Sequence, residues 1–388
     1  MYKLLKHIYE AIIFLIAFII GNLMLINKKN RQVYLIGERR NEARDNGYHL
    51  FKYIRENHPE DRVFYVIEKS SDDFNKVKKY RNILEYGSFK HYLMVCIADK
   101  LICAHLDSCL IDTPIVWKAL DYKLIKAKRV FIQHGITISN HHSLMYDNNK
   151  IDKFICGAKP EYEYINTKFG YPEDSVKYLG FCRFDNLHNY KLKNIVLLMP
   201  TWRAWLGGET WGGNDYNKFI QSQYYKKYSS LIHNPQLIDL LKENNLKLIF
   251  YPHYEMQKYI KSFKSYSNRI IIANKENYDV QNLLKESRIL ITDYSSIAFD
   301  FAYMRKPVLY YQFDTNKYYR EHYNKGYFDY KKHGFGPVLE IENELVMELK
   351  KIVDNKIQNI DYKERISDFF ELYDNQNCKR NYEEIKKI

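Results

Sequence analysis

The sequence has few cysteines, and no two of them form a C-x-x-C pair. They are irregularly spaced, and several lie inside apolar runs such as "YLMVCIADKLICAHL". A zinc site or a disulfide framework requires closer and more regular spacing. We therefore expect buried, reduced thiols of a cytosolic protein, rather than disulfides or a metal site, at Cys96, Cys103, Cys109, Cys156, Cys182 and Cys378.

The sequence also lacks a zinc finger, an RNP motif and a basic heptad, although the chain is basic. Its formal net charge is +13. Such a charge favours an anionic partner: phospholipid, a polyphosphate-like polymer, a nucleotide or nucleic acid. The basic residues are scattered, so nucleic acid is the least favoured of these partners and we expect none. We also expect no metal and no cofactor.

No hydrophobic run is long enough for an ordinary membrane span. The longest one starts at Ala11, ends at Ile26 and is interrupted by Asn22, whereas a spanning helix needs roughly 20 apolar residues. Lysines flank it on both sides and indicate no orientation, and "NLMLINKKN" offers no signal-peptide cleavage site. We expect residues 1–30 to form a membrane-associating helix that lies in or dips into the cytoplasmic leaflet. A single span and a helix packed on the protein itself are the alternatives.

The rest of the chain alternates short apolar runs with helical patterns. "QVYLIG", "RVFYVIE" and "RVFIQHG" are typical of strands in the first half, as are "NIVLLMPTWR", "NRIIIAN" and "KPVLYY" in the second. This alternation indicates βαβ units and mostly parallel sheets. We expect an α/β fold of two Rossmann-like lobes, residues 31–190 and 191–388, joined near residues 188–194 and ending in helices. A ligand of such a fold lies at the carboxyl ends of the strands, in the cleft between the lobes.

Each half has a histidine directly after an expected strand. "FIQHGITISN" contains His134 and Gly135, and "LIFYPHYEM" contains His253. A histidine can act as a general base near neutral pH, and a glycine lets the backbone turn sharply or approach a ligand closely. We expect His134 and His253 to be catalytic and Gly135 to bind substrate. An ordinary loop histidine is the alternative for His134.

Two segments with an arginine also follow strands. "LLMPTWRAW" contains Thr201 and Arg203, and an arginine there can clamp a phosphate or neutralise a carboxylate. A salt bridge between the lobes is the alternative. "YLGFCRFDNL" places Arg183 and Asp185 just before the lobe junction, where they either contact a ligand or pair with each other. We take all four as candidate substrate-binding residues.

The stretch "LITDYSSIAFDF" concentrates polar groups where a strand meets a helix. A helix N-terminus presents unpaired N–H groups and binds phosphate. Ser295 and Ser296 add hydroxyl donors, and capping the helix would need only one of them. Thr292 and Asp293 complete the cluster. We expect all four to bind substrate, with Asp293 orienting a donor or meeting a ligand hydroxyl.

Together these residues resemble the CDP-glycerol glycerophosphotransferase family, which contains teichoic acid primases and polymerases, with relatives in capsule and lipopolysaccharide synthesis. The resemblance covers about residues 33–340. The chain departs from the polymerases at "HGITISN", where they usually have Thr and a nearby Lys after HG. The matching elements follow the family's order: "HG" at 134–135, "GFCRFDNL" at 180–187, "PTWR" at 200–203, "PH" at 252–253 and "ITDYSSIAFDFAYMRKPVLYYQFD" at 291–314.

The resemblance implies a GT-B fold and transfer of glycerol phosphate, or a related polyol phosphate, to a hydroxyl of a lipid-linked or polymeric glycan. The donor would be CDP-glycerol or CDP-ribitol, and CMP would be released. By position, His134 matches the family's proposed base, and His253, Ser295 and Ser296 match residues at the donor diphosphate. The implied role is in teichoic acid, capsule or other surface polysaccharide synthesis. The implied location is the cytoplasmic face of the bacterial cell membrane, as a peripheral or monotopic protein.

Two other functions suit the same fold. One is a GT-B glycosyltransferase that uses a nucleotide sugar, and the other is a non-catalytic, membrane-associated binding protein. Donor hydrolysis separates the first from a polyol-phosphate transferase, and loss of function in His134→Ala separates the second.

Overall fold

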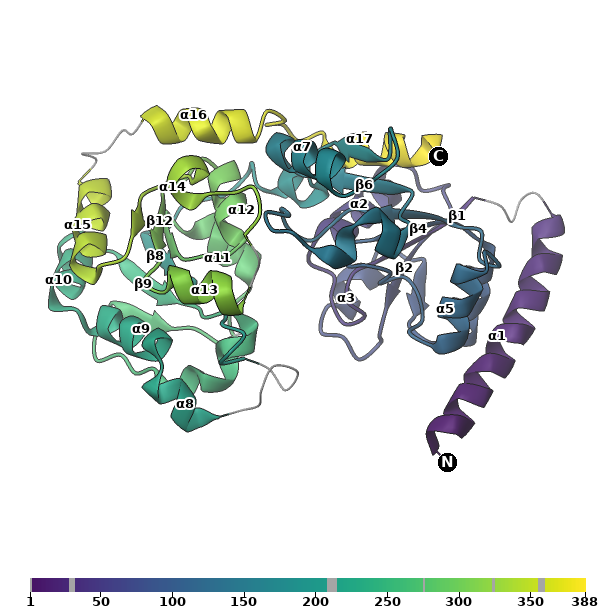
Figure 1. The fold of residues 1–388 in the computed structure, drawn as a ribbon, viewed down its shortest axis with the longest axis horizontal. Helices are drawn as coiled ribbons and strands as arrows, with labels where there is room; N and C mark the ends of the chain where they lie inside the picture. Colours follow the sequence, from purple (N-terminus) through teal and green to yellow (C-terminus); the bar gives the residue numbers. More distant parts are fainter. Residues whose placement is uncertain (1, 28–31, 208–214, 275, 323–324, 355–359) are drawn as a thin grey trace. The chain divides into compact units, whose positions relative to one another are not determined.

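The computed structural model describes residues 2–27, 32–207, 215–274, 276–322, 325–354 and 360–388. The chain divides into two compact units (Figure 1). Each unit is built around its own parallel sheet. Unit 1 comprises Met1–Ile136, His142–Asn186 and Asp374–Ile388, and unit 2 comprises Thr137–His141 and Leu187–Tyr373.

Within the described residues, the sheet of unit 1 has seven strands, and all their pairings are parallel. Parallel strands are covered on both faces and therefore consist of continuous apolar runs, as in the fully buried β1. In spatial order the strands are β3 (Ile83–Glu85), β2 (Val63–Ile67), β1 (Val33–Gly37), β4 (Ala98–Cys103), β5 (Lys128–Phe131), β6 (Lys153–Cys156) and β7 (Val176–Tyr178).

Alternating side chains of this sheet enter two different cores. Val33 and Leu35 of β1 pack on one face with residues of the helices α1, α4 and α5, whereas Tyr34 and Ile36 pack on the other face with α2 and α17. The helices of unit 1 are α1 (Tyr2–Ile26), α2 (Asn46–Asn57), α3 (Phe74–Lys78), α4 (Phe89–Ile97), α5 (Pro114–Asp121), α6 (Tyr146–Asn149), α7 (Lys159–Lys168) and α17 (Asn377–Lys387), with the 3-10 helices η2 (His142–Leu144) and η3 (Cys182–Asn186).

Unit 2 repeats this architecture with six parallel strands among its described residues. Their order is β10 (Ile270–Ile272), β9 (Lys247–Phe250), β8 (Ile195–Leu198), β11 (Ile289–Thr292), β12 (Val308–Tyr311) and β13 (Val338–Leu339). The helices are α8 (Tyr216–Gln221), α9 (Gln223–His233), α10 (Pro235–Glu243), α11 (Val280–Glu286), α12 (Ile297–Tyr303), α13 (Thr315–Glu321), α14 (Tyr330–His333), α15 (Glu342–Val353) and α16 (Ile360–Phe369), with the 3-10 helix η5 (Tyr254–Ser262).

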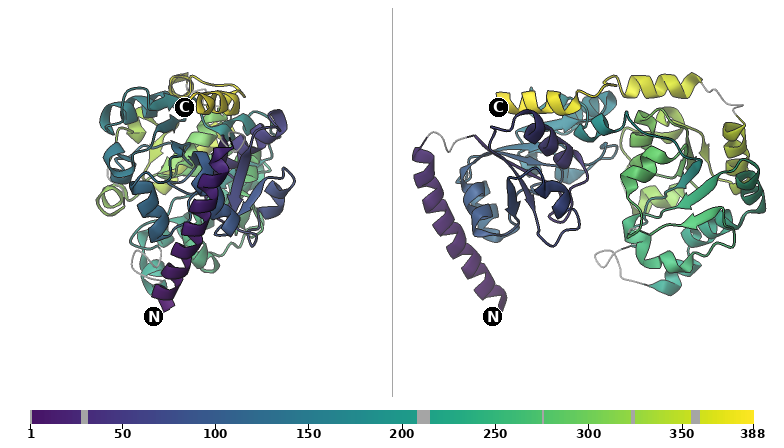
Figure 2. Two further views of the ribbon diagram at one scale, coloured as in Figure 1. Left: turned by 90° about the vertical axis from the view of Figure 1, so that its right-hand side faces the viewer. Right: turned by 180° about the vertical axis from the view of Figure 1, so that it is seen from behind.

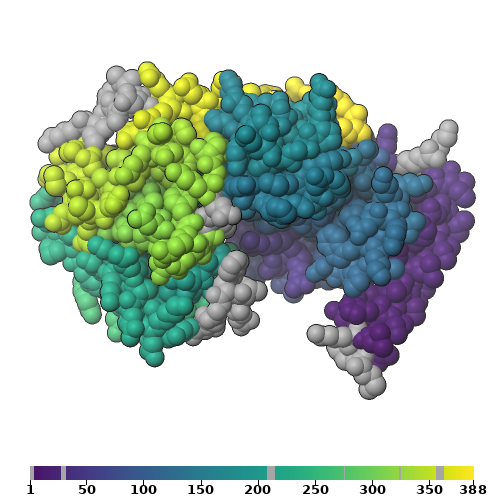
Figure 3. Space-filling view, in the orientation of Figure 1, coloured from purple at the N-terminus to yellow at the C-terminus, as the bar shows by residue number. Residues whose placement is uncertain are grey.

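The N-terminal helix α1 packs along α4 and α5 by one face only. Phe14 and Ala17 are buried there, and a side chain at Gly21 would press against Cys96 and Ile97. The opposite face is apolar and open to solvent, and Figure 3 shows α1 (purple) at the surface. Its Leu4–Ile26 segment is long and apolar enough to cross a membrane by length and composition. The helix is longer than the apolar run, since it begins at Tyr2 and includes Lys6 and His7. Residue 1 and residues 28–30 of the expected segment lie outside the described part.

The last helix, α17, belongs to unit 1 and not to the second lobe, where the sequence led us to expect it. It contacts α2 and η3, and Figure 2 shows it in yellow at the C-terminus. Cys378, Tyr382 and Ile385 of α17 are buried in the core that α2 shares with the sheet. The reason for the difference is thus a long-range apolar contact, which local sequence patterns do not reveal.

Candidate functional site

His134 follows β5 on a loop that the surrounding backbone fixes. The left-handed residue of this loop is Gln133 (φ 55°) and not Gly135, and its side-chain amide donates to the Ile155 carbonyl at 2.7 Å. Nδ1 of His134 lies 3.3 Å from the Ala104 carbonyl oxygen. Because a carbonyl only accepts hydrogen bonds, Nδ1 carries the hydrogen and Nε2 keeps its lone pair. This is the tautomer that a general base needs.

A second histidine lies flat against this ring. His105 and His134 stack with their ring centroids 4.2 Å apart and an interplanar angle of 9°. His134 keeps an exposed surface, yet desolvation by the packed residues around it lowers its pKa to about 4, and Arg39 and Arg183 add to this effect. Hydrogen bonding to Ala104 acts in the opposite direction. His134 is therefore neutral at pH 7, and its Nε2 lone pair is unprotonated.

Asn46, at the start of α2, ties the His134 loop to the segment that contains Arg183. Its side-chain nitrogen donates to the carbonyls of Ile132 (3.0 Å) and Gln133 (2.7 Å). Its side-chain oxygen accepts from the backbone N–H of Arg183 at 3.1 Å. The guanidinium of Arg183 is buried and pairs with Asp45 at 3.0 Å. We did not single out Asn46 from the sequence, where its place in "ARDNGYHL" carries no chemical signal.

Arg183 and Asp185 do not pair with each other, contrary to one expectation. The Asp185 carboxylate accepts from the backbone N–H groups of Asn377 (2.9 Å) and Cys378 (2.8 Å) and from the Asn377 side chain. It thus caps the N-terminus of α17. Gly180 has φ +77°, and a Cβ atom there would lie 1.8 Å from the Asn377 side-chain oxygen. Within "GFCRFDNL", Gly180 and Asp185 therefore hold the C-terminal helix α17 in place.

The first loop of unit 1 does not offer a helix N-terminus to a phosphate. The buried Glu38 carboxylate accepts from the backbone N–H groups of Arg44 (2.7 Å), Asp45 (2.9 Å) and Tyr48 (2.7 Å), and so fills the start of α2. Burial raises the pKa of Glu38, and these three hydrogen bonds oppose that rise. An internal carboxylate occupies the place that a ligand phosphate takes in many Rossmann folds.

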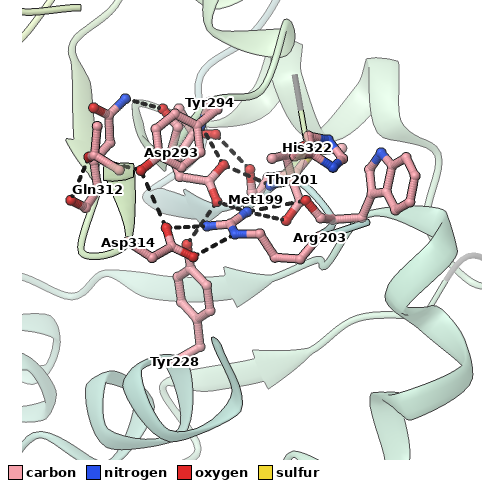
Figure 4. A network of polar contacts seen from close by, with 12 residues as sticks. Met199, Thr201, Arg203, Tyr228, Asp293, Tyr294, Gln312, Asp314 and His322 are labelled. Carbon is pink, nitrogen blue, oxygen red and sulfur yellow. Dashed lines mark hydrogen bonds and ion pairs between the residues drawn. The ribbon is translucent and has the colours of Figure 1, made fainter. Parts of the chain in front are cut away.

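In unit 2, Arg203 is an internal residue and not an exposed phosphate clamp. Its side chain has no exposed surface. It pairs with Asp314 through Nε (2.7 Å) and one terminal nitrogen (3.0 Å). The other terminal nitrogen lies 2.9 Å from Asp293 and donates to the carbonyls of Thr201 and Trp202 (Figure 4). Arg203 thus neutralises two carboxylates, as one of our expectations allowed, and both belong to unit 2, so the ion pair does not join the lobes.

Charge compensation makes this burial possible. Burial alone would lower the pKa of Arg203, but Asp293 and Asp314 raise it overall. The guanidinium also lies over the rings of Tyr294 and Tyr318, with ring centroids 5.2 and 5.3 Å away. A buried ion pair of this kind fixes geometry more than it adds stability. It holds the loops after β8, β11 and β12 in one arrangement.

Asp293 also faces inward. Its carboxylate accepts from the N–H groups of Thr201 (2.8 Å) and Tyr294 (2.6 Å) and from the Tyr228 hydroxyl (3.2 Å). Burial raises its pKa, whereas Arg203 and the two N–H groups lower it. Its acceptor sites are occupied by protein donors, so it orients the Thr201 loop and does not meet a ligand hydroxyl.

The remaining polar residues of "TDYSS" differ from one another. The Thr292 hydroxyl donates to the Met199 carbonyl at 2.7 Å and joins β11 to the end of β8. Ser295 is nearly buried and Ser296 is exposed. Ser296 occupies the N-cap position of α12 without a side-chain capping bond, and neither serine hydroxyl has a hydrogen-bond partner within the described residues. These two hydroxyls are available to a ligand.

Two histidines flank Trp202 near these loops. His253 follows β9, and its Nδ1 accepts from the Glu255 N–H at 3.3 Å, so Nε2 carries a hydrogen. Its ring lies parallel to Trp202, with centroids 6.2 Å apart. His322, at the end of α13, accepts from the Ala204 N–H at 3.0 Å and meets Trp202 edge-on at 4.6 Å.

His322 was not predicted, because "YYREHYNKG" resembles any polar helix end. Burial lowers its pKa to about 3, and the charges of Arg203 and His253 contribute to the shift. It is therefore neutral at pH 7. Across the described residues, no group of three or more His, Cys, Asp or Glu side chains is placed to hold a metal ion.

The candidate residues of unit 2 share one edge of its sheet. The strands β9, β8 and β11 are neighbours, and His253, Thr201 and Ser295 follow their carboxyl ends. In parallel α/β sheets, ligands bind at this edge. The groups at this edge are hydrogen-bond donors, the N–H of His253 and the two serine hydroxyls, and such a set suits an anion.

Comparison with known proteins gives a consistent result. A family model described as CDP-glycerol:poly(glycerophosphate) glycerophosphotransferase matches residues 18–387. The minor teichoic acid biosynthesis protein GgaB of Bacillus subtilis (strain 168) is 35% identical over 371 residues, which are 94% of this chain and 40% of the relative. The teichoic acid poly(glycerol phosphate) polymerase of the same strain is 24% identical over 357 residues, 84% of this chain and 43% of the relative. The chain thus spans about two fifths of the length of these relatives.

Solved structures share the fold. The wall teichoic acid polymerase TagF has a TM-score of 0.67 and 17% identity, over 100% of this chain and 97% of that chain. UDP-GlcNAc 2-epimerase from Neisseria meningitidis has a TM-score of 0.55 and 12% identity, over 92% and 100% of the respective chains. At these identities the likeness establishes the fold alone, which is α/β and GT-B-like, as we expected from the sequence.

Proposed function

This chain belongs to the CDP-glycerol:poly(glycerophosphate) glycerophosphotransferase family, and on that premise we propose that it is a polyol-phosphate transferase. It moves glycerol phosphate, or a related polyol phosphate, from CDP-glycerol or CDP-ribitol to a hydroxyl of a lipid-linked or polymeric glycan, and CMP leaves. The similarity to teichoic acid biosynthesis proteins supports a role in the synthesis of such a surface polymer.

The main support for a donor-binding site is a difference among the polar residues of "TDYSS". Thr292 and Asp293 are engaged by the protein, while the hydroxyls of Ser295 and Ser296 have no partner within the described residues. Together with Nε2–H of His253, they supply hydrogen-bond donors for the diphosphate of a CDP-polyol. Arg203 holds the loops that present these donors and does not itself touch the donor substrate.

The reaction needs a base for the acceptor and stabilisation of the leaving group. In this proposal, the acceptor oxygen attacks the phosphorus that bears the polyol and forms a new P–O bond. The bond from that phosphorus to the bridging oxygen breaks, and this oxygen leaves with CMP. The acceptor proton moves to Nε2 of His134, which holds the lone pair because Nδ1 bonds to Ala104. Donors at the diphosphate compensate the charge that develops on the leaving phosphate.

In this proposal, α1 attaches the protein to the cytoplasmic face of the membrane. One face of this helix is buried against unit 1, and its opposite face exposes Ile12, Leu15, Ile19 and Leu23. A helix that packs lengthwise on a globular unit suits attachment in the plane of one leaflet better than a span. Burial of the exposed apolar side chains in lipid supplies the driving force, and the positive net charge of the chain adds attraction to anionic lipid.

A donor panel tests the function. The purified full chain is incubated with a glycan acceptor and with CDP-glycerol, CDP-ribitol, UDP-sugars or GDP-sugars, and nucleotide products are separated by chromatography. We expect acceptor-dependent release of CMP from a CDP-polyol. Consumption of a UDP- or GDP-sugar alone would assign a glycosyltransferase. Binding of CDP-glycerol without turnover under any condition would indicate a binding protein.

A further inference from the structure

His105 stacks on the proposed base, His134, and has no role in the reaction proposed above. It follows β4 just as His134 follows β5, and the two strands are paired with Cys103 opposite Phe131. The two histidines therefore leave the same edge of the sheet on adjacent strands. Their rings stack in parallel, with centroids 4.2 Å apart at 9°.

The packing of His105 includes a feature that lowers the stability of the fold. Its Nδ1 is buried and has no hydrogen-bond partner within the described residues. A buried polar atom without a partner costs free energy, and an apolar ring would avoid that cost. Burial, His134 and Arg39 lower the pKa of His105 to about 2, so its ring is neutral and takes no proton near pH 7.

We propose that His105 is a positioning residue for His134. Its flat ring covers one face of the imidazole, and the Ala104 carbonyl holds Nδ1, so these two contacts restrict rotation of the His134 ring. Nε2 is then held toward the acceptor hydroxyl without an entropy cost at the moment of proton transfer. The inference rests on the proposed function, because it assigns His134 the role of the base.

Other groups near His134 do not supply this restraint. The charged residues that act on it are Arg39 and Glu42, from the loop after β1, and Arg183, from η3. Arg39 is bonded to Glu42 at 3.4 Å and Arg183 to Asp45 at 3.0 Å. These residues set the electrostatic environment of the ring, whereas His105 contacts its face.

Three substitutions of His105 test whether its flat ring is required or whether any side chain that fills the space is sufficient. His105→Phe keeps an aromatic ring, His105→Leu fills the volume without one, and His105→Ala leaves a void that admits water. We expect His105→Phe to keep kcat within about threefold. His105→Leu and His105→Ala should lower kcat roughly 10- to 100-fold, with the KM for CDP-glycerol unchanged. Unfolding temperatures identify any variant that fails to fold.

A second readout does not depend on turnover. In protein with ring-labelled histidine, the His134 signal is assigned by its absence in His134→Asn and followed through a pH titration. We expect the ring-current shift of a stacked imidazole in the parent and in His105→Phe, and its loss in the Leu and Ala variants. In His105→Ala, entry of water should also raise the pKa of His134 toward 6.5.

The outcomes are distinct. Parent-like kcat in His105→Leu, or kcat in His105→Phe as low as in His105→Leu, would overturn the role of the stacked ring. An unshifted His134 signal in the parent would overturn it as well, even for a protein that turns over no CDP-polyol. A parent that is inactive while its His134 signal depends on the stacked ring would contradict the proposed function and leave the stacking restraint intact.

Discussion

At the residue scale, the polar side chains of "TDYSS" serve two purposes. Thr292 and Asp293 form hydrogen bonds with backbone groups and hold the end of β11 against the end of β8. Ser295 and Ser296 come next in the chain, and their hydroxyls are left over. The first pair therefore affects a ligand only through the loops, whereas the second pair is expected to touch it.

Replacement of either serine tests this division. Ser295→Ala or Ser296→Ala should weaken CDP-glycerol binding roughly 10- to 100-fold, because a hydrogen bond to a charged group contributes on the order of 1.5–3 kcal/mol. Neither hydroxyl makes a capping bond, so the unfolding temperature should not change. Calorimetric titration gives the affinity, and Ser230→Ala on α9 is the matched control. Unchanged affinity with lowered stability would show that the serines act only in folding.

Arg203 shows where residue-level prediction ends. The sequence correctly places it after a strand, but its partner Asp314 lies 111 residues further along the chain. No local pattern reveals whether an arginine turns outward to a ligand or inward to a distant carboxylate. The same holds for Asp185, whose partners are 192 and 193 residues away. The histidines were easier to place, because strand ends determine their position.

At the element scale, docking of α17 on unit 1 depends on one carboxylate. Asp185→Ala removes the acceptor of the first N–H groups of α17 and should lower the free energy of unfolding by on the order of 2 kcal/mol. Denaturant unfolding measures this loss, with the exposed Asp121→Ala as control. We expect CDP-glycerol affinity to stay unchanged. Full stability together with weakened donor binding would instead show that Asp185 binds the ligand.

The face of α1 that is open to solvent provides a second test at this scale. Replacing Ile12, Leu15 and Ile19 together by Glu alters only exposed positions and leaves the buried contacts of Phe14 and Ala17 in place. The variant should remain folded and should no longer float with anionic vesicles at physiological salt, because the helix loses its apolar surface.

Persistent vesicle binding of that variant would mean that the basic body of the protein, and not α1, attaches it to the membrane. Loss of folding would mean that the exposed face has a structural role. Leu124→Glu, at an exposed apolar site outside α1, is the control.

Element boundaries were predictable where apolar runs were short. The strands from "QVYLIG" and "NRIIIAN" are present as β1 and β10. By contrast, "HYLMVCIADKLICAH" is a mostly apolar stretch with only Asp99 and Lys100 in its middle, and it divides into α4 and β4 at Ala98. Both elements are buried, so neither shows the periodicity that separates helix from strand.

At the scale of the whole molecule, burial keeps several histidines neutral. The free energy of unfolding should therefore depend on pH in the acid range. His91 has no exposed surface, and burial lowers its pKa to about 4. Between about pH 6.5 and pH 4 the unfolded chain binds a proton there that the folded chain does not bind. The free energy of unfolding should therefore fall as the pH falls through this range, by on the order of 3 kcal/mol from His91.

Urea unfolding at pH 7 and at pH 4.5 measures this dependence. His91→Gln removes the titrating group, so the difference between the two pH values should shrink in that variant. The exposed His142→Gln is the control. An equal pH dependence in the parent and in His91→Gln would show that other groups cause the acid sensitivity.

The two units also divide the proposed chemistry. Unit 1 contains the candidate base, and its first helix N-terminus is closed by Glu38. Unit 2 contains the hydroxyls and the histidine N–H that suit a diphosphate. The sequence predicted this division because each half restarts the strand–helix alternation with its own strand-end histidine. It did not predict that α17 belongs to unit 1, since α17 contacts α2 and η3, which are far from it in the sequence.

The most direct test of the account compares turnover and donor affinity in His134→Ala. CMP release from CDP-glycerol in the presence of a glycan acceptor gives the turnover, and calorimetric titration gives the dissociation constant. We expect turnover to fall roughly 10²- to 10⁴-fold, while CDP-glycerol affinity stays within about threefold of the parent and His142→Ala behaves like the parent. Near-normal turnover in His134→Ala would contradict the assignment of the base and with it the central claim.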